Sequence, residues 1–177
     1  DFDFSRPEKR YVFSSLMQLL NIKLRESMRE EKGGVYGVSL RGSTFREPLP
    51  TYSINLRFTC DPARVEELIA TAMQDIAQVQ QKGASQEELH KVTAIQRQRV
   101  IRGLKENGFW LSQLTSRYKE GRPVNPIGLA LLEKRIAALT AEAIRQAALT
   151  YFGQAYQIRL VWLPEQQAAA PTDRQEK

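Results

Sequence analysis

The stretch LRESMREEKGGVYGVSL, residues 24–40, contains the junction between a helix and a strand. Upstream, apolar residues recur at helical spacing and predict a helix from about Phe13: Leu16, Leu19, Leu20, Leu24 and Met28. Gly33 and Gly34 can adopt the positive φ that closes a helix C-terminus. Residues 35–41 then read as a strand. Arg29 in the last helical turn and Tyr36 near the start of the strand are therefore expected to project into one space.

Two acidic residues at this junction contradict a local rule of helix electrostatics. Glu30 and Glu31 place negative charge at the helix end that favours cations. Conflicts of this kind are expected at functional sites. Solvated carboxylates paired with nearby arginine or lysine side chains would explain them equally well.

Residues 52–60 show the clearest strand pattern in the chain. Alternate residues divide into two faces, one holding Tyr52, Ile54, Leu56, Phe58 and Cys60 and the other holding Ser53, Asn55, Arg57 and Thr59. The first face is expected to pack on helices and the second to be wet or to line a cavity. Residues 42–51, with two prolines, form a link too long for a tight hairpin turn.

Helices with recognisable caps are predicted to follow. Asp61 is an expected N-cap, Ser85 and Glu88 form a capping box, and Thr140 caps a later helix. The helices are expected from Pro62 to Gly83, from Ser85 to about Glu106, from about 107 past 114, over about 128–136 and over 141–152. Residues 156–163 alternate again and predict a final strand.

This order of elements lacks βαβ alternation. It favours an α+β fold, with an antiparallel or mixed sheet and helices on one face, in the order helix-strand-strand-helices-strand. Residues 1–163 are expected to form a single domain, a fragment of a larger multi-domain protein. Residues 164–177 lack apolar periodicity and are expected to be a disordered C-terminal tail, which suggests the end of the parent protein.

The composition is that of an ordinary soluble domain. The chain has 177 residues, a formal net charge of +6 and no apolar run long enough to span a membrane. A lone cysteine, Cys60, excludes an internal disulfide and does not separate periplasm from cytosol. No signal peptide is visible, although the abrupt polar start suggests that upstream sequence is missing.

Three features together resemble one family of enzymes. REEKGGVY at residues 29–36, NGFW at 107–110 and the order of elements are similar to the C-terminal-half domains of pitrilysin/insulinase-type zinc metallopeptidases. The resemblance is greatest to the long bacterial PqqL-type zinc proteases and covers roughly residues 11–163. It implies a metallopeptidase LuxS/MPP-like domain, the last of four, whose opening strands lie upstream.

The family's zinc motif, H-x-x-E-H with a downstream glutamate, is absent from this chain. A catalytic zinc needs three protein ligands, and this sequence offers one histidine, His90, and one cysteine. His90 lies inside a helical pattern with no second histidine or cysteine three or four residues later. The chain alone is therefore expected to be inactive, with Zn²⁺ bound by another domain of the parent protein.

The resemblance assigns roles to two residues. In the family, an arginine and a tyrosine at this spacing reach across a closed chamber to the zinc site, and here they are Arg29 and Tyr36. Tyr36 would donate a hydrogen bond to the developing oxyanion, and Arg29 would hold substrate carbonyls or a carboxylate. From spacing alone, Tyr36 would instead be a packed strand aromatic, and Arg29 would pair with Glu26.

Two other groups of residues permit further interpretations. Asn107, Phe109 and Trp110 are expected to cap and pack helices, and the resemblance leaves a substrate contact open. Lys91, Arg99, Arg102 and Lys105 share one helical face, without aromatic residues between them. A solvated helix face explains this better than a nucleic-acid surface, and within a protease the same charges would favour acidic peptides.

The sequence thus predicts the substrate-binding, non-catalytic C-terminal domain of a zinc endopeptidase. Its expected partners are a peptide or unfolded protein substrate and the remaining domains of the same protease, with no nucleic acid and no membrane span. The alternative is a catalytically dead scaffold or binding module of the same fold. Bacterial relatives suggest a periplasmic location, with the cytoplasm as the alternative.

Overall fold

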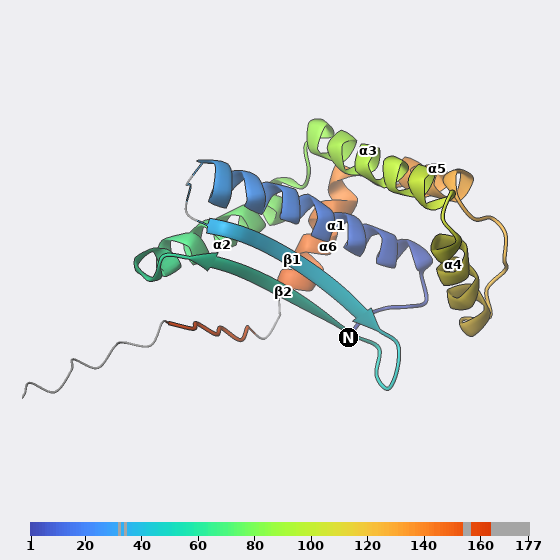
Figure 1. Cartoon of the computed structure of the whole chain (residues 1–177), viewed down its shortest axis with the longest axis horizontal. Helices are drawn as coiled ribbons and strands as arrows, with labels where there is room; N and C mark the ends of the chain where they lie inside the picture. The colour runs from blue at the N-terminus through green and yellow to red at the C-terminus, as the bar shows by residue number, and fades with distance from the viewer. Residues whose placement is uncertain (32, 34, 154–156, 164–177) are drawn as a thin grey trace, which may run out of the picture.

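The computed structural model of the chain describes residues 1–31, 33, 35–153 and 157–163. Its first helix, α1, spans Pro7–Arg25 and runs directly into a π-helical segment, η1, over Glu26–Glu31. A hairpin of two strands follows, β1 over Val35–Phe45 and β2 over Thr51–Cys60. The fold is α+β, as predicted (Figure 1).

The remaining regular elements of the described chain are helices. A short 3-10 helix, η2, occupies Pro62–Arg64 and leads into the remaining α-helices. They are α2 over Val65–Lys82, α3 over Gln86–Gly103, α4 over Asn107–Lys119, α5 over Leu129–Ala137 and α6 over Ala141–Phe152. No helix in the described ranges is both long and apolar enough to cross a membrane.

The predicted caps are present. The Asp61 carboxylate accepts a hydrogen bond from the Ala63 amide at 2.9 Å, and Thr140 Oγ1 accepts one from the Ala143 amide at 3.0 Å. Ser85 and Glu88 form the complete capping box at the start of α3. These side chains satisfy amides that have no partner within their own helix, which explains where each helix begins.

The sheet is a single antiparallel hairpin, with β1 paired to β2. Its strands are longer than predicted, so the connecting loop is confined to residues 46–50. The two faces of β2 agree with the predicted alternation: the apolar set packs against the core, and Asn55, Arg57 and Thr59 are exposed. Gly42 permits the close approach of β1 to α1, because a Cβ there would lie 2.6 Å from the side chains of Phe13 and Met17.

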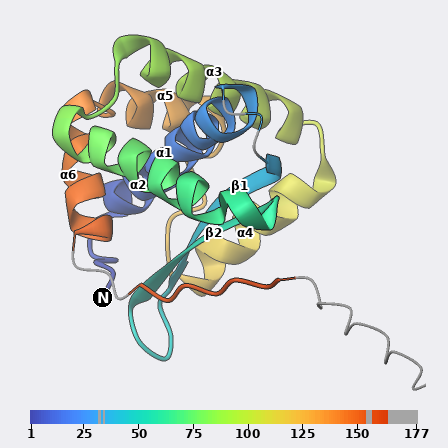
Figure 2. The ribbon, with the colours of Figure 1, turned by 90° about the vertical axis from the view of Figure 1, so that its left-hand side faces the viewer.

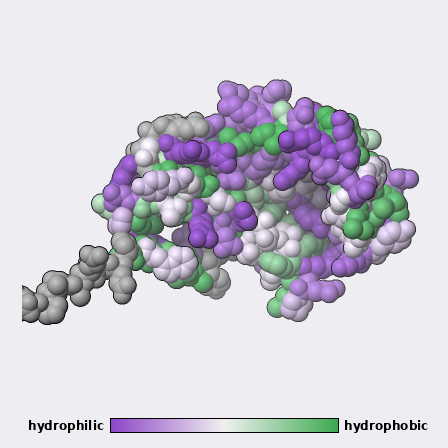
Figure 3. Space-filling model, viewed as in Figure 1, coloured by the Kyte–Doolittle hydropathy of each residue, from purple (hydrophilic) through white to green (hydrophobic). Residues whose placement is uncertain are grey.

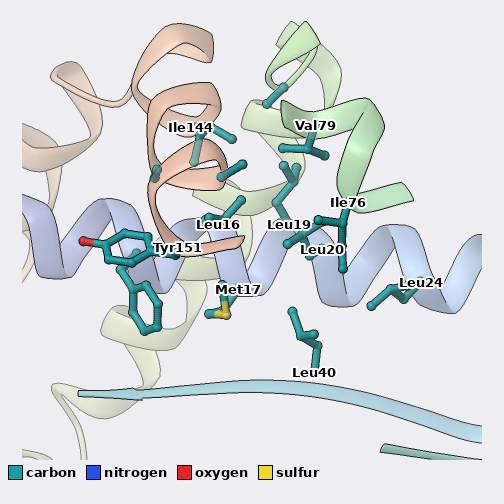
Figure 4. Packing of buried hydrophobic residues seen from close by; sticks show 14 of the residues in the cluster. Leu16, Met17, Leu19, Leu20, Leu24, Leu40, Ile76, Val79, Ile144 and Tyr151 are labelled. Carbon is teal, nitrogen blue, oxygen red and sulfur yellow. The ribbon is translucent and has the colours of Figure 1, made fainter. Parts of the chain in front are cut away.

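Helix α1 lies at the centre of the molecule. Figure 4 shows it between the sheet, represented by Leu40, and the helices α2 and α6, represented by Val79 and Ile144. The residues of the predicted apolar stripe are fully or almost fully buried: Leu16, Leu19, Leu20, Leu24 and Met28. The view along the other axis places α1, α2 and α6 on one side of the hairpin (Figure 2). This burial supplies the main driving force for the fold.

A polar network joins α1 to α3. Gln96 accepts a hydrogen bond from the Tyr11 hydroxyl at 2.6 Å and donates to Ser15 Oγ at 3.0 Å and to Gln18 at 3.2 Å. Ser15 is fully buried, so this bond satisfies a hydroxyl that has no access to water. These hydrogen bonds fix the position of α3 relative to α1.

The predicted final strand is not formed. Tyr156 lies outside the described residues, and residues 157–163 are extended without strand pairing (Figure 1). Ile158, Leu160 and Trp162 are 86%, 74% and 83% exposed. An alternating pattern becomes a strand only when its backbone groups find a neighbouring strand, and among the described residues β1 and β2 pair only with each other. The predicted tail, residues 164–177, also lies outside the described residues.

Candidate functional site

The helix that carries Arg29 changes geometry before it ends. Over Glu26–Glu31 the α-helix widens into a π-helix, a conformation that is rare in proteins and frequent at functional sites. Met28 is fully buried and anchors this segment to the core, whereas the next side chain, Arg29, is exposed. Gly33 adopts φ +56°, as predicted, and its amide donates to the Arg29 carbonyl at 3.1 Å.

Tyr36 occupies a β-bulge. Val35 faces Cys60 and Gly37 faces Thr59, so Tyr36 is an extra residue on β1 without its own partner on β2. A bulge of this kind redirects a side chain and is common beside active sites. Val35 is buried and fixes the start of the strand, while Tyr36 is 87% exposed. The interpretation of Tyr36 as a packed strand aromatic is therefore wrong.

An open pocket lies beside Tyr36. It has a volume of about 260 Å³ and is lined by Gly33, Val35, Tyr36, Asp61 and Arg64. The Arg64 guanidinium donates to the Glu67 carboxylate at 3.2 and 3.3 Å, and this pairing raises the pKa of Arg64. The pocket thus combines a phenol, a carboxylate and a guanidinium, which are groups that hydrogen-bond to peptide.

The structure does not bring Arg29 into this pocket. Its side chain is exposed, but it is not among the residues that line the space beside Tyr36. Within the described residues it forms no ion pair with Glu26, whose carboxylate lies 3.7 Å from Lys91 Nζ. The side chains of Glu30 and Glu31 lie outside the described part. A shared space for Arg29 and Tyr36 stays a prediction.

The sequence does not predict the bulge, the π-helix or the roles of two pocket residues. It indicates Asp61 only as a helix cap and gives no role to Arg64, because neither belongs to a contiguous motif with Tyr36. The available signal was Gly37 directly after Tyr36, since a glycine inside a strand pattern often marks a bulge.

The described residues do not fit a zinc ion. They contain no group of three or more histidine, cysteine, aspartate or glutamate side chains placed to hold a metal. His90 is exposed on α3, and burial raises the pKa of the Cys60 thiol, which disfavours the thiolate that zinc requires.

The remaining candidate residues lie away from this pocket. Arg99 and Arg102 are exposed on α3, whose outer surface is mostly hydrophilic (Figure 3), and Lys91 pairs with Glu87 at 3.0 Å. Trp110 does not fill the core between helices as expected: it is 38% exposed, and its Nε1 donates to the Leu104 carbonyl at 3.1 Å.

The six α-helices and the one antiparallel hairpin of the described ranges define an α+β domain. Residues 3–95 match the sequence model of a family described as the peptidase M16 inactive domain. The chain belongs to this family, and within it corresponds to the inactive domain.

Two curated proteins are similar in sequence. The first is the zinc protease PQQL-like of Arabidopsis thaliana, 25% identical over 160 residues, which are 81% of this chain and 16% of that protein. The second is the probable zinc protease PqqL of Haemophilus influenzae, 32% identical over 99 residues, which are 55% of this chain and 10% of that protein. The chain thus spans between a tenth and a sixth of these relatives.

A solved structure shows the same fold. The periplasmic protease PqqL from Escherichia coli superimposes with a TM-score of 0.65 at 22% identity, covering 84% of this chain and 16% of that one. The predicted fold class and the predicted family are both confirmed.

Proposed function

We propose that this chain is the substrate-binding, non-catalytic C-terminal domain of a zinc-dependent endopeptidase. The observation that carries the proposal is Tyr36, which is 87% exposed on a β-bulge beside an open pocket. A large aromatic residue at the start of a strand is normally buried. Its hydroxyl makes no hydrogen bond to another described residue, and so it is available to a ligand.

Tyr36 is proposed to act on the scissile peptide bond of the substrate. Its hydroxyl would donate a hydrogen bond to the carbonyl oxygen as negative charge develops there, and a donor of this type is typically worth about 10²–10³ in rate. Arg29, charged at any working pH, would hold substrate carbonyls or a carboxylate near the same bond.

Zinc is proposed to be bound by another domain, since the described residues here do not fit it. When bound there, it would supply an activated water for attack on the peptide carbonyl. The partners are then peptides or unfolded proteins and the other domains of the protease, which together enclose the substrate. Residues 1–163 would form one domain of that protein. We propose a periplasmic location, supported by the Escherichia coli structure.

The test uses the parent protein, containing this chain and its upstream sequence. Tyr36→Phe removes one hydroxyl, and kcat for an unstructured peptide is expected to fall about 10²-fold at unchanged zinc content. Tyr118→Phe is the matched control, because Tyr118 is 74% exposed on a different element, α4, and its substitution should leave kcat unchanged.

An unchanged kcat in the Tyr36→Phe protein would overturn the assigned role. A wild-type parent that is inactive and free of zinc would instead favour the catalytically dead scaffold. Zinc content and activity of the wild type therefore separate the two functions before any variant is made.

A further inference from the structure

Four arginines converge at the end of the hairpin remote from Tyr36. Arg6 and Arg10 come from the start of α1, Arg46 from the hairpin loop, and Arg122 from the segment after α4. With Phe4, Pro7 and Glu120 they line an open depression of about 40 Å³, called here the arginine pocket. The eleven residues of β1 separate it from the pocket beside Tyr36, a span of roughly 30 Å in a strand.

The arginine pocket has far more positive than negative charge. Glu120 is its one acidic lining residue, and two of the four arginines already share it: Arg10 Nη1 lies 3.4 Å and Arg122 Nε 2.9 Å from its carboxylate. Glu120 also accepts a hydrogen bond from Ser116 at 2.8 Å. Within the described residues, neither Arg6 nor Arg46 has a carboxylate within ion-pair distance.

Packing contacts position two of these arginines, Arg122 and Arg46. Arg117, only 6% exposed, donates to the carbonyls of Pro123 and Pro126 at 2.5 and 2.6 Å and so holds the segment that carries Arg122. Arg46 lies over the Phe4 ring, with its guanidinium carbon 5.4 Å from the ring centre. Guanidinium groups held in this way lose less entropy when they bind a ligand.

The pKa values of two neighbouring groups, Arg135 and Glu120, respond to the positive charge of the arginine pocket. Burial and the charges of Arg122, Arg10 and Arg117 lower the pKa of Arg135 on α5. Burial would raise the pKa of Glu120, but the bond from Ser116 and the charges of Arg10 and Arg122 prevail and lower it. Glu120 therefore stays ionised at neutral pH, and the pocket still has an excess of positive charge. The buried Nε atom of Arg117 has no hydrogen-bond partner within the described part of the chain.

We infer that the arginine pocket binds a small oxyanion of the phosphate type. Each guanidinium group presents paired N–H donors that match the oxygens of phosphate. Four guanidinium groups line one depression, and the negative charge of a single glutamate does not neutralise their four positive charges. The depression is small, which fits one phosphoryl group better than an extended polyanion. The anion is either free phosphate or the phosphoryl end of a small metabolite.

The test is isothermal titration calorimetry of the 177-residue chain with inorganic phosphate at constant ionic strength. The wild type is expected to bind one phosphate in a saturable manner, and the double variant Arg6→Gln/Arg46→Gln to bind at least about tenfold more weakly, since each lost guanidinium removes charge-assisted hydrogen bonds to the anion. The matched control is Arg99→Gln/Arg102→Gln, which removes the same charge from exposed positions on α3.

Equal binding by the two double variants would overturn the inference, because phosphate would then respond only to net charge. Absence of saturable binding to the wild type would overturn it as well. Far-UV circular dichroism establishes that each variant is folded, and Arg46→Lys provides a second variant that keeps the charge but loses the planar fork.

A nucleoside triphosphate that binds at least tenfold more tightly than phosphate would identify a phosphorylated metabolite, and equal affinity would identify the free anion. Neither result depends on peptidase activity.

Discussion

The side chain of Arg29 is exposed, so its positive charge is accessible to a substrate. It is exposed at the end of a helix whose preceding residue, Met28, is fully buried. In the parent protease, Arg29→Gln is expected to lower kcat/KM about 10–100-fold, the equivalent of one charged hydrogen bond to substrate. Arg25→Gln, one helical turn earlier and also exposed, is the control. Similar losses in both variants would show that general charge, rather than a positioned contact, is responsible.

Tyr151 is a residue whose titration contributes to stability. Burial, with Tyr52 and Asp3 nearby, raises its pKa from 10.0 to about 12. The folded state holds this proton more tightly than the unfolded chain, so the stabilisation is complete below pH 10 and is lost as the pH rises from 10 to about 12. The loss should be about 3 kcal/mol, measured by urea unfolding across this range. Tyr151→Phe should remove that pH dependence; if its alkaline profile matches the wild type, another group is responsible.

At the scale of single elements, the sequence predicted best where the determinants are local. Asp61, Ser85 and Thr140 marked helix starts correctly because a cap depends on amides only two or three residues away. The bulge at Tyr36 was not predicted, because it is a property of register between β1 and β2. The extended residues 157–163 were assigned wrongly for a related reason: the pattern of a strand does not specify its partner.

The junction between α2 and α3 provides a test at this scale. Gly83 has φ +70°, and a Cβ there would lie 2.5 Å from the backbone carbonyl oxygen of Ala141. Gly83→Ala should therefore destabilise the protein by about 1–3 kcal/mol, measured by urea unfolding. Gly108→Ala makes the same chemical change within α4, where nothing lies within 4 Å of the added carbon, and should stabilise by up to about 1 kcal/mol. Equal effects would contradict the steric account.

For the whole molecule, stability depends on the central helix. Leu20 on α1 is fully buried between the sheet and the covering helices, so Leu20→Ala should cost about 2–5 kcal/mol in the free energy of unfolding. Leu111 on α4 is 69% exposed, and Leu111→Ala should change stability by less than about 0.5 kcal/mol. A small loss at Leu20 would mean that the core rearranges to fill the space.

The candidate site shows where prediction from the sequence is limited at this scale. REEKGGVY and its resemblance to a family indicate Tyr36 and Arg29, whereas residue spacing alone favours a packed tyrosine. The arginine pocket was not predicted, because Arg6, Arg46 and Arg122 are far apart in the chain and meet only after folding. Contacts between distant segments leave no periodic signal in a single sequence.

The central position of α1 also has a consequence for the order of events during synthesis. The sheet that covers one side of this helix follows directly in the chain, so α1, β1 and β2 can associate early through local contacts. Its other side is covered in part by α6, which is translated after all the other helices. On the ribosome, part of the apolar surface formed by Leu16 and its neighbours therefore stays exposed until residue 152 has emerged. During this interval a chaperone can bind the exposed apolar surface.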